Sequence, residues 1–287
     1  MPSASERGGH PVPLVVNADD YALTERVSRG ILRAHREGIV SSTSILAVAP
    51  AFEMTVRWLG DAPQLGVGVH LALVGEDPPL ITAGAIPTLV DRSGRFAASW
   101  RAFLLRAAAG RIDPEDVERE LAAQIERVLA ANVAITHLDS HQHLHLWPLV
   151  GEVTLRLARR FGIRAVRVPR SRGRRLAGIG VNLLARRLSR RAEEEELAFP
   201  RAVAGFDEAG RMDLSTLIAS LEGLGQLRRG PAELFVHPGE PDDPDLSRYA
   251  WGYRWPDELA ALVDPRARKA VIDLGFELST YASAAKR

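Results

Sequence analysis

Short apolar runs along the chain alternate with longer segments of helical period. The run "VPLVVNADD" predicts a buried strand that ends in two acids. The segment "TERVSRGILRAHREG" follows it as an amphipathic helix, with Thr24 as N-cap and Gly38 just past its end. Because strands and helices go on alternating toward the C-terminus, the pattern predicts a parallel sheet with helices outside it. That sheet is either an open doubly wound sheet or a closed barrel.

The later elements follow the same order, with one interruption. Further strands are expected at "IVSSTSILAV", "LGVGVHLAL", "AITHLDSH", "RAVRV", "RAVAGF", "AELFVH" and "FELSTY". Asp113 and Pro114 predict the start of a helix that runs to about Ala131, and "PLVGEVTLRLARRF" predicts another that stops at Gly162. Residues 75–112 break the alternation after the third strand. We expect them to form an excursion over the face of the sheet.

Acidic and histidine residues stand at the carboxyl ends of strands that are far apart in the sequence. They are Asp19 and Asp20, His70, the cluster from His137 to His145, and His237. In a barrel these strand ends converge on one face, whereas an open sheet would spread them out. The pattern therefore favours a single barrel domain over residues 12–287, preceded by a disordered tail at residues 1–11.

Composition narrows the chemistry. The 37 basic and 36 acidic residues give a net charge of +1, so bulk charge predicts no nucleic-acid partner. The absence of cysteine excludes disulfides, thiolate metal sites and a cysteine nucleophile. The N-terminal "MPSASERGGH" lacks the apolar region of a secretory signal, and no apolar run approaches the ~20 residues of a membrane span. These features predict a cytoplasmic protein.

Four of the eight histidines lie in "HLDSHQHLH", residues 137–145. The strand is expected to end near Ser140, so the later histidines fall in a loop that leads to the helix at Pro148. Any one of them, like His70 or His237, could be a structural residue at a strand end, and Asp19 and Asp20 could cap the following helix. Together with the acids, however, they predict a metal site and the groups that support it.

Four ordered motifs resemble those of one family. "VVNADD", "GVGVHLAL", "THLDSHQHLH" and "ELFVHPGE" resemble the YdjC-like (ChbG/HpnK) carbohydrate deacetylases, and the resemblance extends from Val12 to about Tyr281. It implies a distorted (β/α) barrel of the TIM type that binds one divalent metal ion, magnesium or zinc. The implied reaction is the removal of acetate from an N-acetylated sugar.

The resemblance also implies roles for individual residues. The metal ligands fall on Asp20, His70 and His141, and Asp19 matches the proposed base. His237 matches a group suggested to act as acid or to bind the intermediate. The family usually continues its acidic pair with Phe-Gly, whereas Tyr21 and Ala22 follow here. This difference is expected to alter the surface that contacts the sugar, but it leaves the metal ligands unchanged.

The implied chemistry suits these residue types. A metal held by two imidazoles and one carboxylate activates water and polarises the amide carbonyl, while a nearby carboxylate accepts the proton and an imidazolium protonates the departing amine. His137, Asp139 and His143 are then expected to orient the ligands, and Arg167 to hold or polarise Asp19. A chitooligosaccharide, a glycolipid of the hopanoid type or another N-acetylated compound would all suit this centre, because the choice of acceptor is expected to lie in loops 75–112 and 170–201.

Two alternatives remain open on sequence alone. A metal-dependent amidohydrolase acting on another amide would also use histidine pairs, usually on the first strand and often with two metals. A binding role is suggested by the ten arginines between Arg164 and Arg191, which could grip nucleic acid or make a peripheral membrane contact.

The same stretch also reads as a solvated surface helix balanced by Glu193 to Glu196, or as a mobile flap with glycines at 173, 178 and 180. Its apolar positions, Ile179, Leu183, Leu184 and Leu188, must be covered by the barrel, a partner chain or lipid. A homo-oligomer is therefore also left open.

Overall fold

The computed structural model describes residues 11–173, 175–227 and 230–285, and the expected N-terminal tail lies outside this part of the chain except for Pro11. Within it, seven parallel strands form one sheet in the order β4-β3-β2-β1-β6-β5, with β7 paired to the start of β1. The strands are β1 (Val12–Tyr21), β2 (Ser42–Ile45), β3 (Gly66–Leu71), β4 (Ile135–Ser140), β5 (Ala202–Ala204), β6 (Ala232–Val236) and β7 (Phe276–Leu278).

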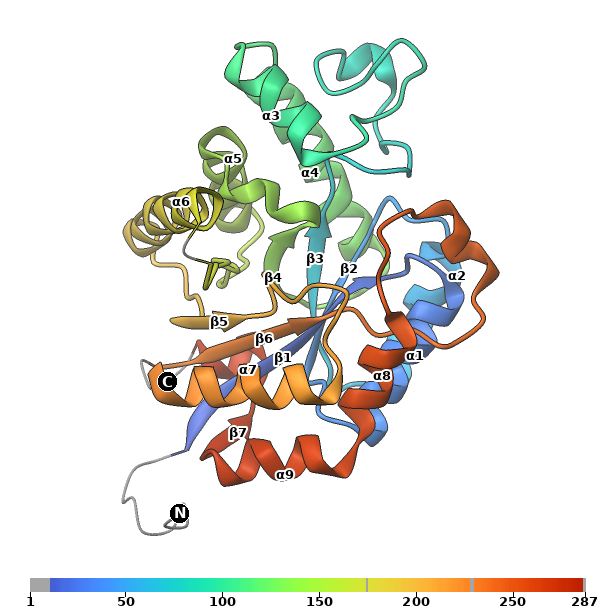
Figure 1. The fold of residues 1–287 in the computed structure, drawn as a ribbon. Coiled ribbons are helices and arrows are strands. Elements are labelled where there is room, and N and C mark those ends of the chain that lie inside the picture. Colours follow the sequence, from blue (N-terminus) through green and yellow to red (C-terminus); the bar gives the residue numbers. More distant parts are fainter. Residues whose placement is uncertain (1–10, 174, 228–229, 286–287) are drawn as a thin grey trace.

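Helices flank this sheet (Figure 1). They are α1 (Glu25–Glu37), α2 (Phe52–Thr55), α3 (Trp100–Ala108), α4 (Pro114–Ala130), α5 (Pro148–Arg160), α6 (Leu176–Glu194), α7 (Leu214–Leu227), α8 (Trp255–Val263), α9 (Pro265–Asp273) and α10 (Tyr281–Ala284). Short 3₁₀ helices are η2 (Val56–Asp61), η3 (Ala83–Ala85), η4 (His141–Leu146) and η5 (Pro244–Arg248). Among the described residues no helix combines the length and the apolar character needed to cross a membrane.

The sheet curves into a half-barrel of the TIM-like α/β class, which confirms the expected fold. β1 lies in the middle, and Leu14, Val15 and Val16 are fully buried because the strand is covered on both faces. Isolated bridges from Leu138 to Val166 and from Ala165 to Ala198 continue the curve beyond β4.

Local signals in the sequence predicted the starts of α1 and α4 correctly. The Thr24 hydroxyl accepts from the backbone N–H of Val27, and Asp113 caps α4 with Pro114 in its first turn. The strand predicted at "RAVRV" is too long, because the structure has only isolated β-bridges at Ala165 and Val166 instead of a continuous ladder. The following Pro169 has no N–H to donate, which ends ladder pairing at that point.

The excursion after β3 is present and is anchored on α4. The Glu120 carboxylate, fully buried, accepts from the backbone N–H groups of Leu80 and Ile81 at 3.1 and 3.0 Å. Asp116 accepts from the backbone N–H of Thr88 at 2.8 Å. These bonds satisfy loop backbone that would otherwise be buried unpaired. The excursion, with α3, therefore stands above the carboxyl end of β3 (Figure 1).

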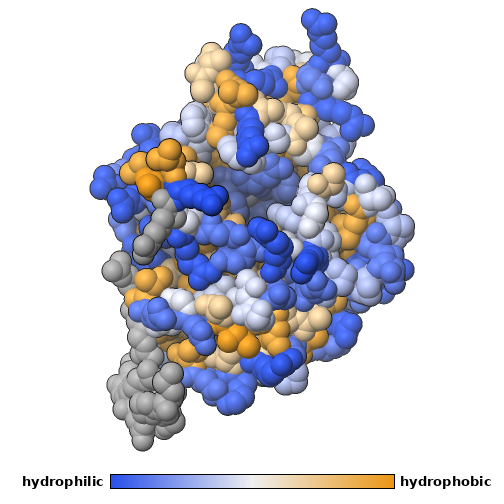
Figure 2. Space-filling view, in the orientation of Figure 1, coloured by the Kyte–Doolittle hydropathy of each residue, from blue (hydrophilic) through white to orange (hydrophobic). Residues whose placement is uncertain are grey.

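The carboxyl ends of the strands open onto one face of the molecule. Figure 2 shows a hydrophilic hollow in this face, over the end of β3 and beneath α3. Strand direction brings the acids and histidines at the ends of β1, β3, β4 and β6 to this region.

The arginine-rich segment forms α6, which packs against α5. Leu188 is buried and touches the position of Gly151, whereas Ile179 and Leu183 are exposed, so the expected apolar stripe is covered only in its second half. Arg191 pairs with Glu152 at 3.0 Å. The second half of α6 is thus a packed, partly neutralised surface helix.

A backbone test of the fold is available at Gly205, which follows β5. Its φ is 111°, and a Cβ there would lie 2.3 Å from the carbonyl oxygen of Phe235 on β6. Gly205→Ala should therefore lower the free energy of unfolding by about 2 kcal/mol or more. Urea denaturation measures this effect. Gly60→Ala is the control, because a Cβ there meets no described heavy atom within 4 Å. Equal stability of the two variants would contradict the packing described.

Candidate functional site

The acidic pair lies at an irregular end of β1. Pairing with β2 shifts between Ala18 and Tyr21, and Asp20 has a left-handed backbone with φ of 66°. Such a bulge re-aims side chains that simple alternation would place otherwise. As a result Asp19 faces Arg167, whereas Asp20 faces two histidines.

Asp20, His70 and His141 form a buried cluster that could hold a metal ion. Asp20 Oδ1 lies 3.5 Å from His70 Nε2 and 3.5 Å from His141 Nδ1, and the potential ligand atoms are all within 4.8 Å of one another. Two ligands about 2.1 Å from a tetrahedral ion lie about 3.4 Å apart. Asp20 Oδ1 is buried without a hydrogen-bond partner among the described residues. The three groups therefore fit a divalent cation.

Asp139 on β4 orients His70. Its Oδ1 lies 2.8 Å from His70 Nδ1, which leaves His70 Nε2 turned toward Asp20. Its Oδ2 accepts from the Ser44 hydroxyl at 2.8 Å. A carboxylate that holds the far nitrogen of an imidazole fixes both its tautomer and its direction, as is typical of histidine ligands to metals.

Arg167 is fully buried among three carboxylates. Its Nη1 and Nη2 both donate to Asp19 at 2.7 Å, its Nε donates to Glu233 at 2.8 Å, and its Nη1 lies 2.8 Å from Asp139. The ring of Phe235 lies 4.5 Å from the guanidinium carbon. The expected contact of Arg167 with Asp19 is therefore present, and two further carboxylates share the same cation.

These contacts set the protonation states of the cluster. Burial disfavours ionisation of Asp19, but the Arg167 guanidinium outweighs it and lowers the pKa of Asp19 to about 2. Burial also opposes protonation of His70, but Asp139 raises its pKa to about 9 when no metal is bound. Burial raises the pKa of Glu233 to about 7. Asp19 therefore stays ionised across the neutral range.

His237 directly follows β6 and lies close to Asp19. Its Nε2 lies 3.9 Å from Asp19 Oδ2, and its backbone N–H donates to Glu258 at 2.5 Å. Glu258 on α8 is fully buried and also accepts from the backbone N–H of Met212 at 3.1 Å. Its other near neighbour is His237 Nδ1, at 3.9 Å. Glu258 thus fixes the turn that carries His237.

The remaining histidines of the 137–145 cluster have different surroundings. His137 lies deeper in the barrel, where it contacts Thr136 Oγ1 at 2.9 Å and stacks on Tyr281 with ring centroids 3.8 Å apart. His143 packs beside the ring of Phe235 at 5.1 Å. His145 bridges Ser140 and the carbonyl oxygen of Arg167. The expected loop is the kinked helix η4, with Gln142 and His143 in the left-handed region.

Sequence reasoning missed several groups at this site. Glu233 and Glu258 are buried acids in apolar elements, and Trp251 packs on His141 with ring centroids 4.8 Å apart. For Glu233 the sequence did carry a signal, because an acid inside the apolar strand "AELFV" is rarely buried without a partner. For Glu258 and Trp251 the contacts arise only when α8 and the loop before it fold back over β6.

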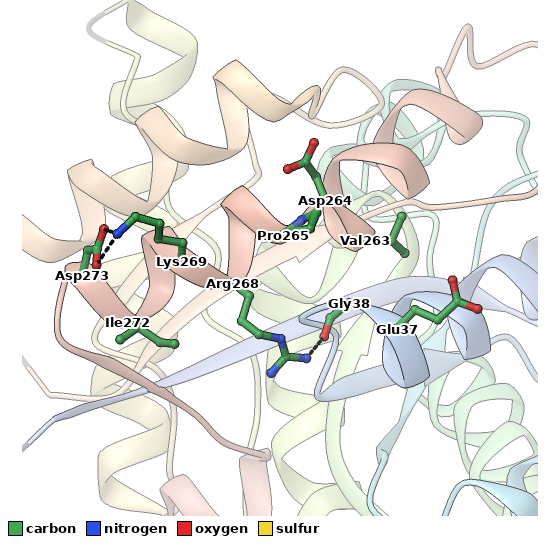
Figure 3. A pocket seen from close by; sticks show the side chains of 9 residues that line it. All are labelled: Glu37, Gly38, Val263, Asp264, Pro265, Arg268, Lys269, Ile272 and Asp273. Carbon is green, nitrogen blue, oxygen red and sulfur yellow. Dashed lines mark hydrogen bonds and ion pairs between the residues drawn. The ribbon is translucent and has the colours of Figure 1, made fainter.

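A separate hollow of about 470 Å³ lies where α1 ends beside the junction of α8 and α9 (Figure 3). Arg268 donates to the carbonyl oxygen of Gly38 there, and Lys269 pairs with Asp273. The chain passes from Gly38 into the start of β2, so this hollow is at the amino ends of the strands. It is therefore remote from the acid and histidine cluster.

Protonation of His137 should destabilise the fold. Burial lowers its pKa to about 3, from an ordinary value of 6.5, so the unfolded chain binds a proton between these values that the folded chain does not. Stability is lost as pH falls below about 6.5. His137→Asn lacks this term, and the wild type's stability advantage over it should shrink by up to about 1.4 kcal/mol per pH unit. Urea denaturation from pH 7 to 5 measures the difference, and a constant difference would disprove the assignment.

The sequence is similar to proteins of one family. A model described as YdjC-like protein matches residues 13–273. A carbohydrate deacetylase of Geobacillus stearothermophilus is 32% identical over 267 residues, covering 93% of this chain and 96% of the relative. One from Brevibacillus brevis is 39% identical over 156 residues, covering 54% of this chain and 59% of the relative.

A solved structure from Enterococcus faecalis V583 is described as a candidate cellobiose-phosphate cleavage protein. It has a TM-score of 0.78 and 24% identity, and the match covers 94% of this chain and 98% of that one, which supports the fold. From the family match and the deacetylase relative that spans nearly its whole length, this chain belongs to the YdjC-like protein family.

Proposed function

We propose that this protein is a metal-dependent hydrolase that removes acetate from an N-acetylated sugar. The observation that carries the proposal is the convergence of Asp20, His70 and His141 beside the Asp19–Arg167 pair. The family relatives named carbohydrate deacetylases support the same reaction. Acetate release from a panel of N-acetylated sugars and glycolipids tests it directly.

Asp20, His70 and His141 would hold one divalent ion, magnesium or zinc. Such an ion supplies Lewis acidity, which polarises the amide carbonyl and lowers the pKa of a water molecule. Asp139 keeps His70 in the binding orientation. A second grouping, Asp19 with His70 and Asp139, is already occupied by the Arg167 guanidinium, so a second cation would have to displace it. This favours one ion and distinguishes the site from a two-metal amidohydrolase.

Asp19 acts as the base. It accepts a proton from the water whose oxygen attacks the carbonyl carbon, and its low pKa keeps it in the accepting form. Arg167 holds both carboxylate oxygens, so the side chain cannot rotate away. A base with so low a pKa holds the proton weakly, so the proton can pass from Asp19 to His237 and from His237 to the leaving nitrogen.

His237 protonates the departing nitrogen. The tetrahedral carbon collapses, the C–N bond breaks with its electron pair on nitrogen, and a proton on that nitrogen gives the free amino sugar and acetate. His237 Nε2 is 3.9 Å from Asp19 Oδ2, so the proposed acid and base lie side by side. Glu258 holds the His237 backbone in this position.

The sugar is an oligosaccharide or a glycolipid. The first half of α6 exposes Leu176, Ile179 and Leu183, and Arg186 and Arg190 are exposed further along the helix. Figure 2 shows an apolar area over this helix. These side chains would suit a lipid tail and an anionic lipid surface, and they favour the glycolipid form of the proposal. Faster acetate release from an N-acetylated glycolipid than from a free oligosaccharide would support that form.

Loss of a ligand should remove the metal and the activity together. His141→Ala deletes one of three coordinating groups, so bound metal and acetate release should both fall at least ~10-fold. Metal analysis by mass spectrometry and an acetate assay measure the two quantities. His35→Ala is the control, because His35 bonds Val40 at the end of α1. Full metal occupancy in His141→Ala would remove His141 from the ligand set.

Loss of the base should spare the metal. Asp19→Asn keeps the shape of the side chain and does not touch Asp20, His70 or His141, so the ion should stay bound while acetate release slows at least ~100-fold. Urea denaturation checks that the variant remains folded, because a buried Arg167 loses part of its compensation. The control is Asp61→Asn, an exposed acid in η2. Wild-type turnover in Asp19→Asn would end its assignment as the base.

A further inference from the structure

An aromatic wall stands beside the candidate site. It consists of Tyr249, Trp251, Tyr253 and Trp255, every second residue of the segment that leads into α8. Successive rings contact one another, with centroids 5.1, 5.7 and 5.3 Å apart. Tyr249 and Trp255 at the ends are buried, whereas Trp251 and Tyr253 in the middle are only half-buried.

The two half-buried rings flank the two sides of the reaction centre. Trp251 packs on the candidate ligand His141, with centroids 4.8 Å apart, and Tyr253 packs on His237, also at 4.8 Å. A group that reaches both the metal cluster and His237 would therefore lie next to the wall. The accessible part of these rings lies next to a hydrophilic cluster. Contact of apolar surface with water is unfavourable, so a ligand that covers the rings gains binding free energy.

Polar contacts hold the wall in place. The Trp251 indole N–H donates to Glu76 Oε1 at 3.1 Å, and the Tyr249 hydroxyl donates to Asp77 at 3.1 Å. Both acids belong to the excursion just after the β3 strand that carries His70. On the other side, Tyr253 fills the space where a Cβ on Gly210 would lie, only 2.1 Å from its ring. The rings are thus positioned before any substrate arrives.

We propose that Trp251 and Tyr253 form the binding platform for the pyranose ring whose acetamido group is hydrolysed. One face of a pyranose presents C–H groups with a slight positive charge, and an aromatic face carries the opposite charge. A flat saturated ring therefore covers this wall while its acetamido group reaches the metal cluster. The inference rests on the proposed function, and it names the feature that selects a cyclic sugar over other acetyl compounds.

The test compares two acetyl substrates with metal-loaded protein. For Trp251→Ala, KM for N,N′-diacetylchitobiose should rise about 5- to 10-fold with little change in kcat, since one aromatic contact is lost. Hydrolysis of N-acetylethanolamine, an acetamide with neither a sugar ring nor an aromatic ring, should lose less than hydrolysis of the disaccharide. Trp251→Phe should recover most of the affinity. Rates are expressed per bound ion, because Trp251 touches His141.

Trp58→Ala is the matched control, since Trp58 is also half-buried but stacks with Arg29 on α1. Binding of N,N′-diacetylchitobiose to Asp19→Asn, with and without Trp251→Ala, is measured by calorimetry. Equal losses on both substrates, or unchanged sugar binding, would overturn the platform. A wild-type protein that releases no acetate from any sugar would instead refute the proposed function, and the calorimetry would still decide whether Trp251 binds the ring.

Discussion

A fully buried guanidinium is the constraint on which this structure depends. Moving an arginine out of water costs several kcal/mol unless carboxylates surround it, and Arg167 meets Asp19 from β1, Asp139 from β4 and Glu233 from β6. The planar fork of donors satisfies all three only in one arrangement of those strands. The curvature of the half-barrel and the position of the candidate base are therefore set by the same ion pairs.

The charges around Arg167 also prepare a place for a cation. The site holds one guanidinium and four carboxyl groups, which are those of Asp19, Asp20, Asp139 and Glu233. Burial raises the pKa of Glu233 to about 7, so this side chain is partly protonated and uncharged near pH 7. The remaining negative charge lies near His70. The pKa of His70 is raised, so without a metal ion its imidazole is protonated and positively charged near neutral pH. A divalent ion at Asp20 would replace that proton and balance the cluster, which links metal binding to proton release.

How far the sequence predicts this site depends on how local each signal is. Strand direction alone brings Asp20, His70 and His141 to one edge, so their convergence was predictable from position and residue type. The left-handed backbone at Asp20 and His143 was not, because neither is glycine and nothing nearby marks the turn. Nor could the sequence show that one arginine serves three acids, since that depends on distances across the barrel.

The loops that surround the cluster depend on each other as much as on the sheet. The backbone N–H of Trp100, at the start of α3, donates to Gln142, the neighbour of His141. Asp77, in the same excursion, accepts from Tyr249 in the segment that follows β6. Because these contacts join the excursion to both η4 and the aromatic wall, a change in loop length on one side would move groups on the other. Under the proposed function, the strand ends would carry the chemistry and the interlocked loops would select what reaches it.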